Sequence, residues 1–161
     1  MLRLFVIATT ALATVLATIF GLAAGADASD WRTNPDAYES GVFLDVSSYK
    51  LLPNGDRQIW ILQTFQKPVE TSDGLVDFQV SQFEFNCPQR TLAVKFTEVY
   101  FMDGKSEPGE KDPAASPRPS DASAERMSDV VCGDMSRLTA VSGEAPVIAH
   151  RYRAIGKMAL Q

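Results

Sequence analysis

Four β-strand patterns between residues 42 and 102 constrain the fold of this chain more than any other feature. Apolar and polar residues alternate along them, which is typical of half-buried strands, and Asn-Gly or Asp-Gly pairs favour tight turns. We expect strands at 42–47, 57–65, 76–87 and 92–102, with turns at Pro53-Asn54-Gly55-Asp56, Asp73-Gly74 and Asp103-Gly104. Strands joined by short turns predict an antiparallel β-meander.

Two of these strands carry finer signals. Ile59-Trp60-Ile61-Leu62 is apolar without alternation, which predicts a central strand covered on both faces. In the third strand the apolar positions change phase between 76–80 and 83–87, as one extra residue near Ser81-Gln82 would produce. We therefore predict a β-bulge there, after which Cys87 shares the inward face of its strand with the preceding phenylalanines.

The N-terminus has the organisation of a secretory signal peptide. Met1-Leu2-Arg3 is a short basic start, Leu4–Ala24 is apolar and uncharged, and Ala26-Asp27-Ala28 is a small-x-small cleavage pattern. We expect residues 1–28 to be removed, which leaves a lead-in at 29–40 and a chain with no integral membrane segment. An uncleaved N-terminal anchor is the alternative, because the apolar run is long enough to span a bilayer. The predicted location is the periplasm or the cell surface.

The predicted export indicates what role the two cysteines have. Cys87 and Cys132 reach an oxidising compartment, where an isolated pair forms a disulfide more often than a metal or redox site. They lie 45 positions apart, and closing a loop of that length stabilises a protein by about 4 kcal/mol in the chain-entropy model. We predict a Cys87–Cys132 disulfide.

A proline-rich segment separates the strands from a predicted helix. Ser106–Ser120 contains four prolines and no aromatic or β-branched residue, so it is expected to be an exposed loop. Ser120 or Asp121 can cap the helix, and Gly133 suits the position just beyond its end. One face of this helix carries Ala124, Met127, Val130 and Val131. The predicted fold class is α+β, a meander with a C-terminal helix tied to it by one disulfide, spanning residues 41–135.

Residues 136–161 are basic in an otherwise acidic chain. From Arg137 onward the net charge is +3, whereas Ser29–Ser136 carries −8. Ile148, Tyr152, Ile155 and Ala159 recur at helical spacing. Three interpretations stay open: an amphipathic segment that contacts anionic lipid, polysaccharide or an acidic partner, a frayed C-terminal tail, or an element that folds back onto the acidic domain.

The order of several short motifs resembles the surface-adhesin protein E family of exported proteobacterial proteins. These motifs are Phe43-Leu44-Asp45, Ile59-Trp60-Ile61-Leu62, Ser81-Gln82-Phe83-Glu84-Phe85-Asn86-Cys87, Arg90, Val99-Tyr100-Phe101 with Asp103-Gly104, and Val130-Val131-Cys132. The resemblance implies an antiparallel sheet with a disulfide-tied C-terminal helix and a role in binding a macromolecule. The chain has no lipobox cysteine, and a proline-rich insert stands where a tryptophan of the family is expected.

The sequence contains few groups of residues that could support catalysis or metal binding. The single histidine, His150, lies close to two arginines, and Glu107 and Glu110 lie in the proline-rich loop, where nothing excludes water. Trp60 and Tyr100 are on strands, where aromatic residues usually pack in the core rather than line a groove. We predict no enzyme activity, no catalytic residue, no metal site and no cofactor.

The remaining expectations concern partners. A net charge of −5 argues against nucleic acid. We expect an exported, non-enzymatic binding protein that recognises a macromolecular partner in a host matrix or in the cell envelope. A periplasmic structural or accessory protein of the envelope is the alternative. The sequence assigns no binding residues and does not define the oligomeric state.

Overall fold

The computed structural model describes residues 28–34, 41–109, 118–119 and 122–159, and of residues 118–119, 122–124 and 156–159 it describes only the main chain. The predicted signal peptide therefore lies outside the described residues, apart from Ala28. The same holds for Glu110 and for the predicted helix caps Ser120 and Asp121.

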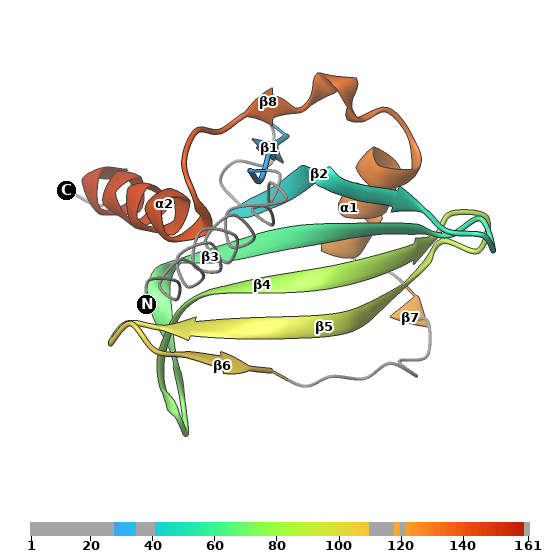
Figure 1. Cartoon of the computed structure of the whole chain (residues 1–161). Helices are drawn as coiled ribbons and strands as arrows, with labels where there is room; N and C mark the ends of the chain where they lie inside the picture. The colour runs from blue at the N-terminus through green and yellow to red at the C-terminus, as the bar shows by residue number, and fades with distance from the viewer. Residues whose placement is uncertain (1–27, 35–40, 110–117, 120–121, 160–161) are drawn as a thin grey trace, which may run out of the picture.

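The described chain forms one antiparallel sheet of long and short strands, together with two helices (Figure 1). The strand order is β6-β5-β4-β3-β2-β1-β8, and β7 also pairs with β5. The strands are β1 (Trp31–Thr33), β2 (Val42–Leu51), β3 (Arg57–Thr71), β4 (Gly74–Asn86), β5 (Thr91–Phe101), β6 (Ser106–Pro108), β7 (Arg118–Pro119) and β8 (Thr139–Ala140). The helices are α1 (Ala122–Cys132) and α2 (Ala145–Ala159), with a 3-10 turn at Met135–Arg137 between them.

The predicted meander is confirmed in β2 to β5, which are consecutive in sequence and antiparallel in space. Gly55, Gly74 and Gly104 adopt positive φ in the turns, as the turn signals require. The predicted bulge near Ser81-Gln82 is wrong, because β4 pairs with β3 without interruption from Phe78 to Phe85, and the register shift between Gln82 and Phe83 places the extra residue in β5, between Val94 and Phe96. The apolar positions of β4 change phase because they change faces of the sheet, with Phe78 on one face and Phe85 on the other.

The core is divided into two clusters that lie on opposite faces of the sheet. Phe43 and Leu44 are adjacent in β2, so their side chains point to opposite faces, and each belongs to a different cluster. β3 contributes Leu62 to one cluster and Ile61 to the other, which confirms a central strand covered on both faces. The first cluster contains Trp31, Phe43, Leu62, Phe78, Ile148, Ala149 and Tyr152, and the second contains Leu44, Ile59, Ile61, Phe85, Val131 and Leu138.

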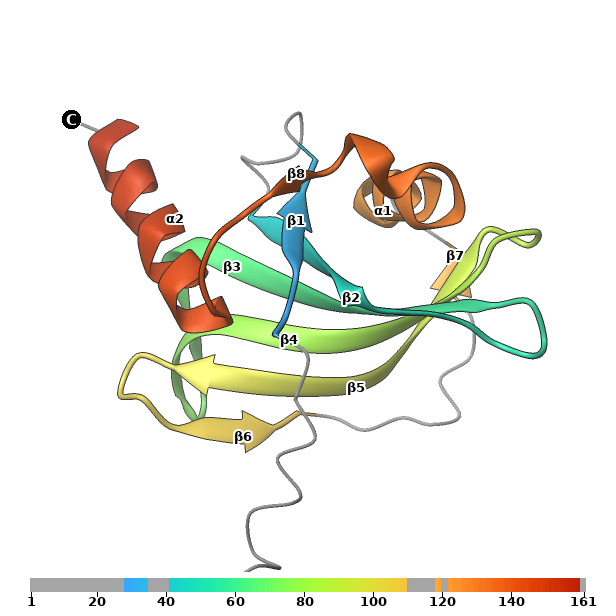
Figure 2. The same cartoon turned by 45° about the horizontal axis from the view of Figure 1, so that its top comes forward.

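Each helix covers one of these faces, and Figure 2 shows the two helices over opposite ends of the long strands. We call the surface with α1 the α1 face and the surface with α2 the α2 face. α1 places Val131 in its cluster, and a disulfide joins its last residue, Cys132, to Cys87, which directly follows β4. The predicted arrangement of sheet, helix and disulfide is therefore present. Gly133 follows α1, but a Cβ there would lie 2.5 Å from the carbonyl oxygen of Asp129, so close backbone approach, not positive φ, favours glycine.

The basic C-terminal segment folds back onto the sheet. After the 3-10 turn, β8 pairs with β1 and becomes the edge of the sheet, and α2 then packs on β3 and β4. Ile148, Ala149 and Tyr152 are buried against the sheet. Of the three interpretations left open by the sequence, the structure therefore shows the element that folds back, for the described part of this segment.

Two regions expected to be irregular contain short strands. Ser106–Pro108 and Arg118–Pro119, at the two ends of the predicted proline-rich loop, both pair with β5. The lead-in contributes β1, which pairs with β2 on one side and β8 on the other. Strands of two or three residues give too short a pattern for alternation to be recognised.

No helix within the described ranges is long and apolar enough to cross a membrane.

Candidate functional site

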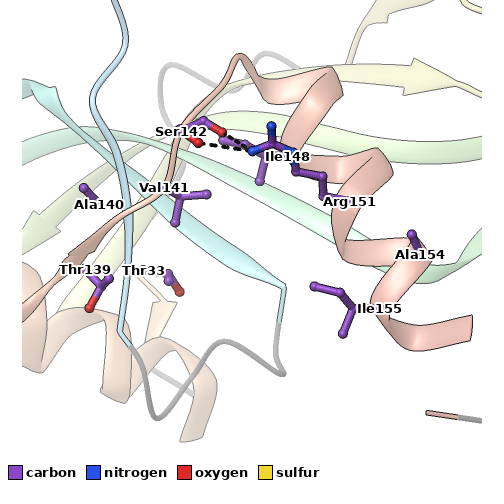
Figure 3. Close-up of a pocket in the computed structure, with 9 residues that line it drawn as sticks. All are labelled: Thr33, Thr139, Ala140, Val141, Ser142, Ile148, Arg151, Ala154 and Ile155. Carbon is purple, nitrogen blue, oxygen red and sulfur yellow. Dashed lines mark hydrogen bonds between the residues drawn. The ribbon is translucent and has the colours of Figure 1, made fainter. Parts of the chain in front are cut away.

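A groove with a volume of about 740 Å³ lies between α2 and the β1–β8 edge of the sheet (Figure 3). Its lining residues come from three elements and the link between β8 and α2. They are Thr33, Thr139, Ala140, Val141, Ser142, Ile148, Arg151, Ala154 and Ile155. We call this the α2–β8 groove.

Local sequence explains where the helical wall begins. Gly143 takes a positive φ of 112°, which turns the chain after β8. Pro146 lies in the first turn of α2, where its missing N–H costs no helical hydrogen bond. The Glu144 carbonyl accepts from the N–H groups of Val147 and Ile148, which starts the helix. Glu144 and Gly143 thus fix the angle at which α2 leaves the sheet edge.

The two faces of α2 have different environments. Ile148 and Tyr152 are buried between the helix and the sheet, at 2% and 4% exposure. Ile155, which lines the groove, is 44% exposed, and so is Val147 at the start of the helix. These exposed side chains leave apolar surface on the helix beyond what the sheet covers.

Two arginines on α2 have different roles. Arg153 forms an ion pair with Asp77 of β4, and both side chains are largely buried. Burial lowers the pKa of the Arg153 guanidinium, and the adjacent carboxylate opposes that effect by favouring the charged form. Arg151 is exposed instead, and its Nη1 donates to the carbonyl of Ser142 at 2.8 Å and to its hydroxyl at 3.2 Å (Figure 3).

The Arg151 guanidinium has no carboxylate partner among the described residues. Its contacts with Ser142 occupy one of the two terminal nitrogens. A guanidinium has five N–H donors, so several remain for a ligand at the rim of the groove. Ser142 therefore orients a cation without neutralising it.

The opposite wall of the groove is held by the sheet. The N–H of Val141 donates to the carbonyl of Trp31 at 2.8 Å, and β8 pairs with β1 through Thr139 and Ala140. The 3-10 turn before β8 is capped by Asp134, whose carboxylate accepts from the N–H of Ser136, and the hydrogen bonds from Ser136 lower the pKa of Asp134. β8 ends the strand order, so its outer edge has no strand partner among the described residues.

The chemical groups that line the groove are mostly apolar. The groove combines apolar side chains, three hydroxyl groups and one cation, and its lining has neither a carboxylate nor a histidine to act as a general base. No cluster of three or more potential metal ligands occurs within the described ranges. Apolar surface with a few orienting polar groups is typical of ligand-binding sites.

Of the residues singled out from the sequence, Ile148 and Ile155 line this groove, whereas the candidates for catalysis or for a ligand groove lie away from it. Trp60 is half-buried and packs edge-to-face on Phe96, with ring centroids 5.6 Å apart. Tyr100 stacks on Phe78 at 4.4 Å, and its partial burial raises the pKa of its hydroxyl. His150 is exposed on α2 and is not among the groove residues. Glu107 is exposed in β6.

Sequence reasoning did not identify the groove itself. The helical spacing of Ile148, Tyr152 and Ile155 was a usable signal for a helix. Pro146 after Gly143 was a second signal, because it marks a helix start. Neither signal could show that the helix lies beside β8, because that contact depends on β1, which is three residues long.

Comparisons with known proteins add little to this geometry. No protein-family model matches the chain, and no curated protein sequence matches it. Among solved structures, crystal form II of Haemophilus influenzae protein E is similar to part of the chain, with a TM-score of 0.44 and 12% sequence identity. The similar region covers 57% of this chain and 80% of that protein. The resemblance to the protein E family noted from the sequence therefore stays a prediction.

Proposed function

We propose that this chain is an exported, non-enzymatic binding protein that holds a polypeptide segment of a macromolecular partner in the α2–β8 groove. The observation that carries this proposal is the groove itself, which places exposed apolar side chains and an unneutralised arginine beside an unpaired strand edge. The Cys87–Cys132 disulfide supports export, because such bonds persist in oxidising compartments.

The form of the groove favours a polypeptide over a small molecule. Figure 3 shows the lining residues of α2 on one side of the groove and those of β1, β8 and the following link on the other. Its volume of about 740 Å³ accommodates several side chains. An edge strand offers backbone donors and acceptors that an extended segment can use, while the helix supplies side-chain contacts.

The test is a selection of displayed random peptides against the oxidised protein. We expect wild type to enrich a set of related peptides, and Ala154→Trp, which fills the groove, to weaken their binding about tenfold. His150→Trp is the matched control, because this exposed residue lies on the same helix outside the groove lining. Equal binding by Ala154→Trp and wild type, with both folded by circular dichroism, would contradict the proposal.

Location is tested separately in the native host. We expect the mature protein to begin near Ser29 and to contain no free thiol. Digestion of intact cells by added protease would indicate surface display and a host-matrix partner. Protection would indicate the periplasm and an envelope partner, which is also where the alternative structural or accessory role would operate. A cytoplasmic fraction with reduced cysteines would overturn export.

A further inference from the structure

We propose that the α2–β8 groove selects an extended acidic peptide in which one Asp or Glu is flanked, two positions away on each side, by an apolar residue. This inference rests on the proposed function, since it names the partner class of the same groove. Three observations support it. They are the N–H donors of Arg151 that Ser142 does not use, the order of exposed side chains along α2, and the open form of the groove.

The charge requirement comes from Arg151. Its guanidinium is oriented by Ser142 through Nη1 and has no carboxylate partner among the described residues. The other arginine nearby on α2, Arg153, is already paired with Asp77 and is turned toward the sheet. A carboxylate of the ligand could accept charge-assisted hydrogen bonds from the Arg151 guanidinium, which pairs with no carboxylate in the described part of the chain.

The apolar requirement comes from the neighbours of Arg151 along the helix. Val147, Arg151 and Ile155 are spaced four residues apart, so they form a single stripe on α2. Val147 and Ile155 are each 44% exposed; Ile155 lines the groove, and Val147 extends the stripe just beyond the groove lining. The stripe therefore presents an apolar group, a cation and an apolar group in succession.

The spacing of this stripe fits an extended chain. Four residues of an α-helix rise about 6 Å, and two residues of a β-strand advance about 6.8 Å. Alternate side chains of an extended peptide laid along α2 would thus meet Val147, Arg151 and Ile155 in turn. Because the stripe is symmetric about Arg151, the pattern of apolar, any, acidic, any, apolar applies in either chain direction.

A fatty acid would also place a carboxylate on an arginine and carbon atoms on apolar surface. The groove favours the peptide because it is open rather than tunnel-like, and because the hydroxyl groups of Thr139 and Ser142 lie among its apolar residues. An acyl chain gains nothing from hydroxyls or from the strand edge, whereas a peptide backbone can hydrogen-bond to both.

The experiment measures binding of labelled peptides to the oxidised protein by fluorescence anisotropy. The probe has Val-Thr-Glu-Thr-Val at its centre, with glycine and serine flanks and blocked ends, so its single charge is the glutamate. One comparison peptide replaces glutamate by glutamine, another replaces it by lysine, and a third has the order Val-Glu-Thr-Thr-Val. We expect the glutamine and reordered peptides to bind about fivefold more weakly than the probe, the size typical of a solvent-exposed ion pair.

Protein variants then locate the interaction. We expect Arg151→Glu to weaken binding of the glutamate peptide about tenfold and to bind the lysine peptide more tightly than wild type does. Arg137→Glu is the matched control, because it changes the charge equally at an exposed arginine outside the groove lining. We expect both variants to unfold at the same midpoint as wild type. Equal midpoints would show that the substitutions change peptide binding and not the stability of the fold.

The outcomes separate this inference from the proposed function. Peptides that bind in an Ala154→Trp-sensitive manner, but with no preference for glutamate or with equal loss from Arg137→Glu, overturn the acidic motif and leave the groove as a peptide site. Failure of every displayed and synthetic peptide to bind overturns both. Displacement of a fluorescent fatty acid by fatty acids and not by peptide also overturns both, because it assigns the groove to a lipid.

Discussion

The two faces of the sheet are each covered by one helix, but they are held in different ways. On the α1 face, a disulfide joins Cys132 to Cys87, and Arg57 Nη1 donates to the carbonyl of Val131 at 2.7 Å. On the α2 face, the helix has no covalent link to the sheet. It is held by the buried side chains of Ile148 and Tyr152 and by the Arg153–Asp77 ion pair.

This difference relates to how much of each helix is free to bind. A disulfide holds α1 through its last residue and limits any separation of that end from the sheet. Side-chain packing holds α2 along one stripe only, so Val147 and Ile155 remain partly exposed beside the groove. The face without a covalent link therefore carries the exposed surface at which we propose that a partner binds, while the cross-linked face supports the fold.

The largest expected effect comes from removing the disulfide. A variant with Cys87→Ala and Cys132→Ala should lose about 4 kcal/mol of unfolding free energy, because its unfolded chain regains the entropy of an open loop between positions 45 apart. Urea unfolding followed by circular dichroism measures this loss. Wild type treated with a reductant should unfold at the same urea concentration as the variant. Equal stability of reduced and oxidised wild type would show that the bond adds nothing to the α1 face.

The next effect probes the α2 face. Ile148→Ala should lower the unfolding free energy by about 3 kcal/mol, since Ile148 is 2% exposed and its deletion leaves a cavity between α2 and the sheet. Ile155→Ala is the matched control on the same helix, and we expect a change below about 0.5 kcal/mol because that side chain is 44% exposed. Similar values for the two variants, measured by urea unfolding, would mean that α2 is not docked as described.

The fold was largely predictable because its central strands are long. Strands of ten or more residues repeat their apolar pattern several times, but the phase change before Phe83 marked a switch of the apolar residues to the other face of the sheet and not the predicted bulge in β4. Disulfide pairing required only two cysteines and an inferred compartment. By contrast, β1 and β8 have three and two residues, and their pairing is non-local, so no local pattern could indicate it.

The groove was not predictable for the same reason. Its walls are elements that are adjacent only because β8 pairs with β1 and α2 folds back afterwards. Arg151 looked like one of several cations in a basic segment, and only its hydrogen bonds to Ser142 distinguish it from Arg153, which is paired with Asp77. Binding surfaces built from non-contiguous residues leave no spacing signature in one sequence.

The smallest expected effect concerns β1, the strand that both faces share. Arg32 donates to the Asp30 carboxylate at 2.7 Å, and this hydrogen bond holds the pKa of Asp30 below its usual range. A depressed folded-state pKa contributes stability above the unfolded pKa of about 3.9, and that contribution is lost as the pH falls through the folded pKa. Because solvent screens this half-exposed pair, the contribution should be smaller than those of the disulfide and of Ile148.

Asp30→Asn should remove this contribution at neutral pH, and the difference from wild type should shrink as the pH falls below the unfolded pKa and through the folded-state pKa of Asp30. Urea unfolding at several pH values across this range measures the difference between the two proteins. Asp103→Asn is the matched control, because the Asp103–Lys105 pair is also exposed but lies in the turn after β5, far in the strand order from β1. If Asp30→Asn also weakened peptide binding in the groove while Asp103→Asn did not, then the position of β1, and with it the β8 wall, would depend on this single surface pair. If neither variant changed binding, the hydrogen bonds between β1 and β8 would be sufficient to hold that wall.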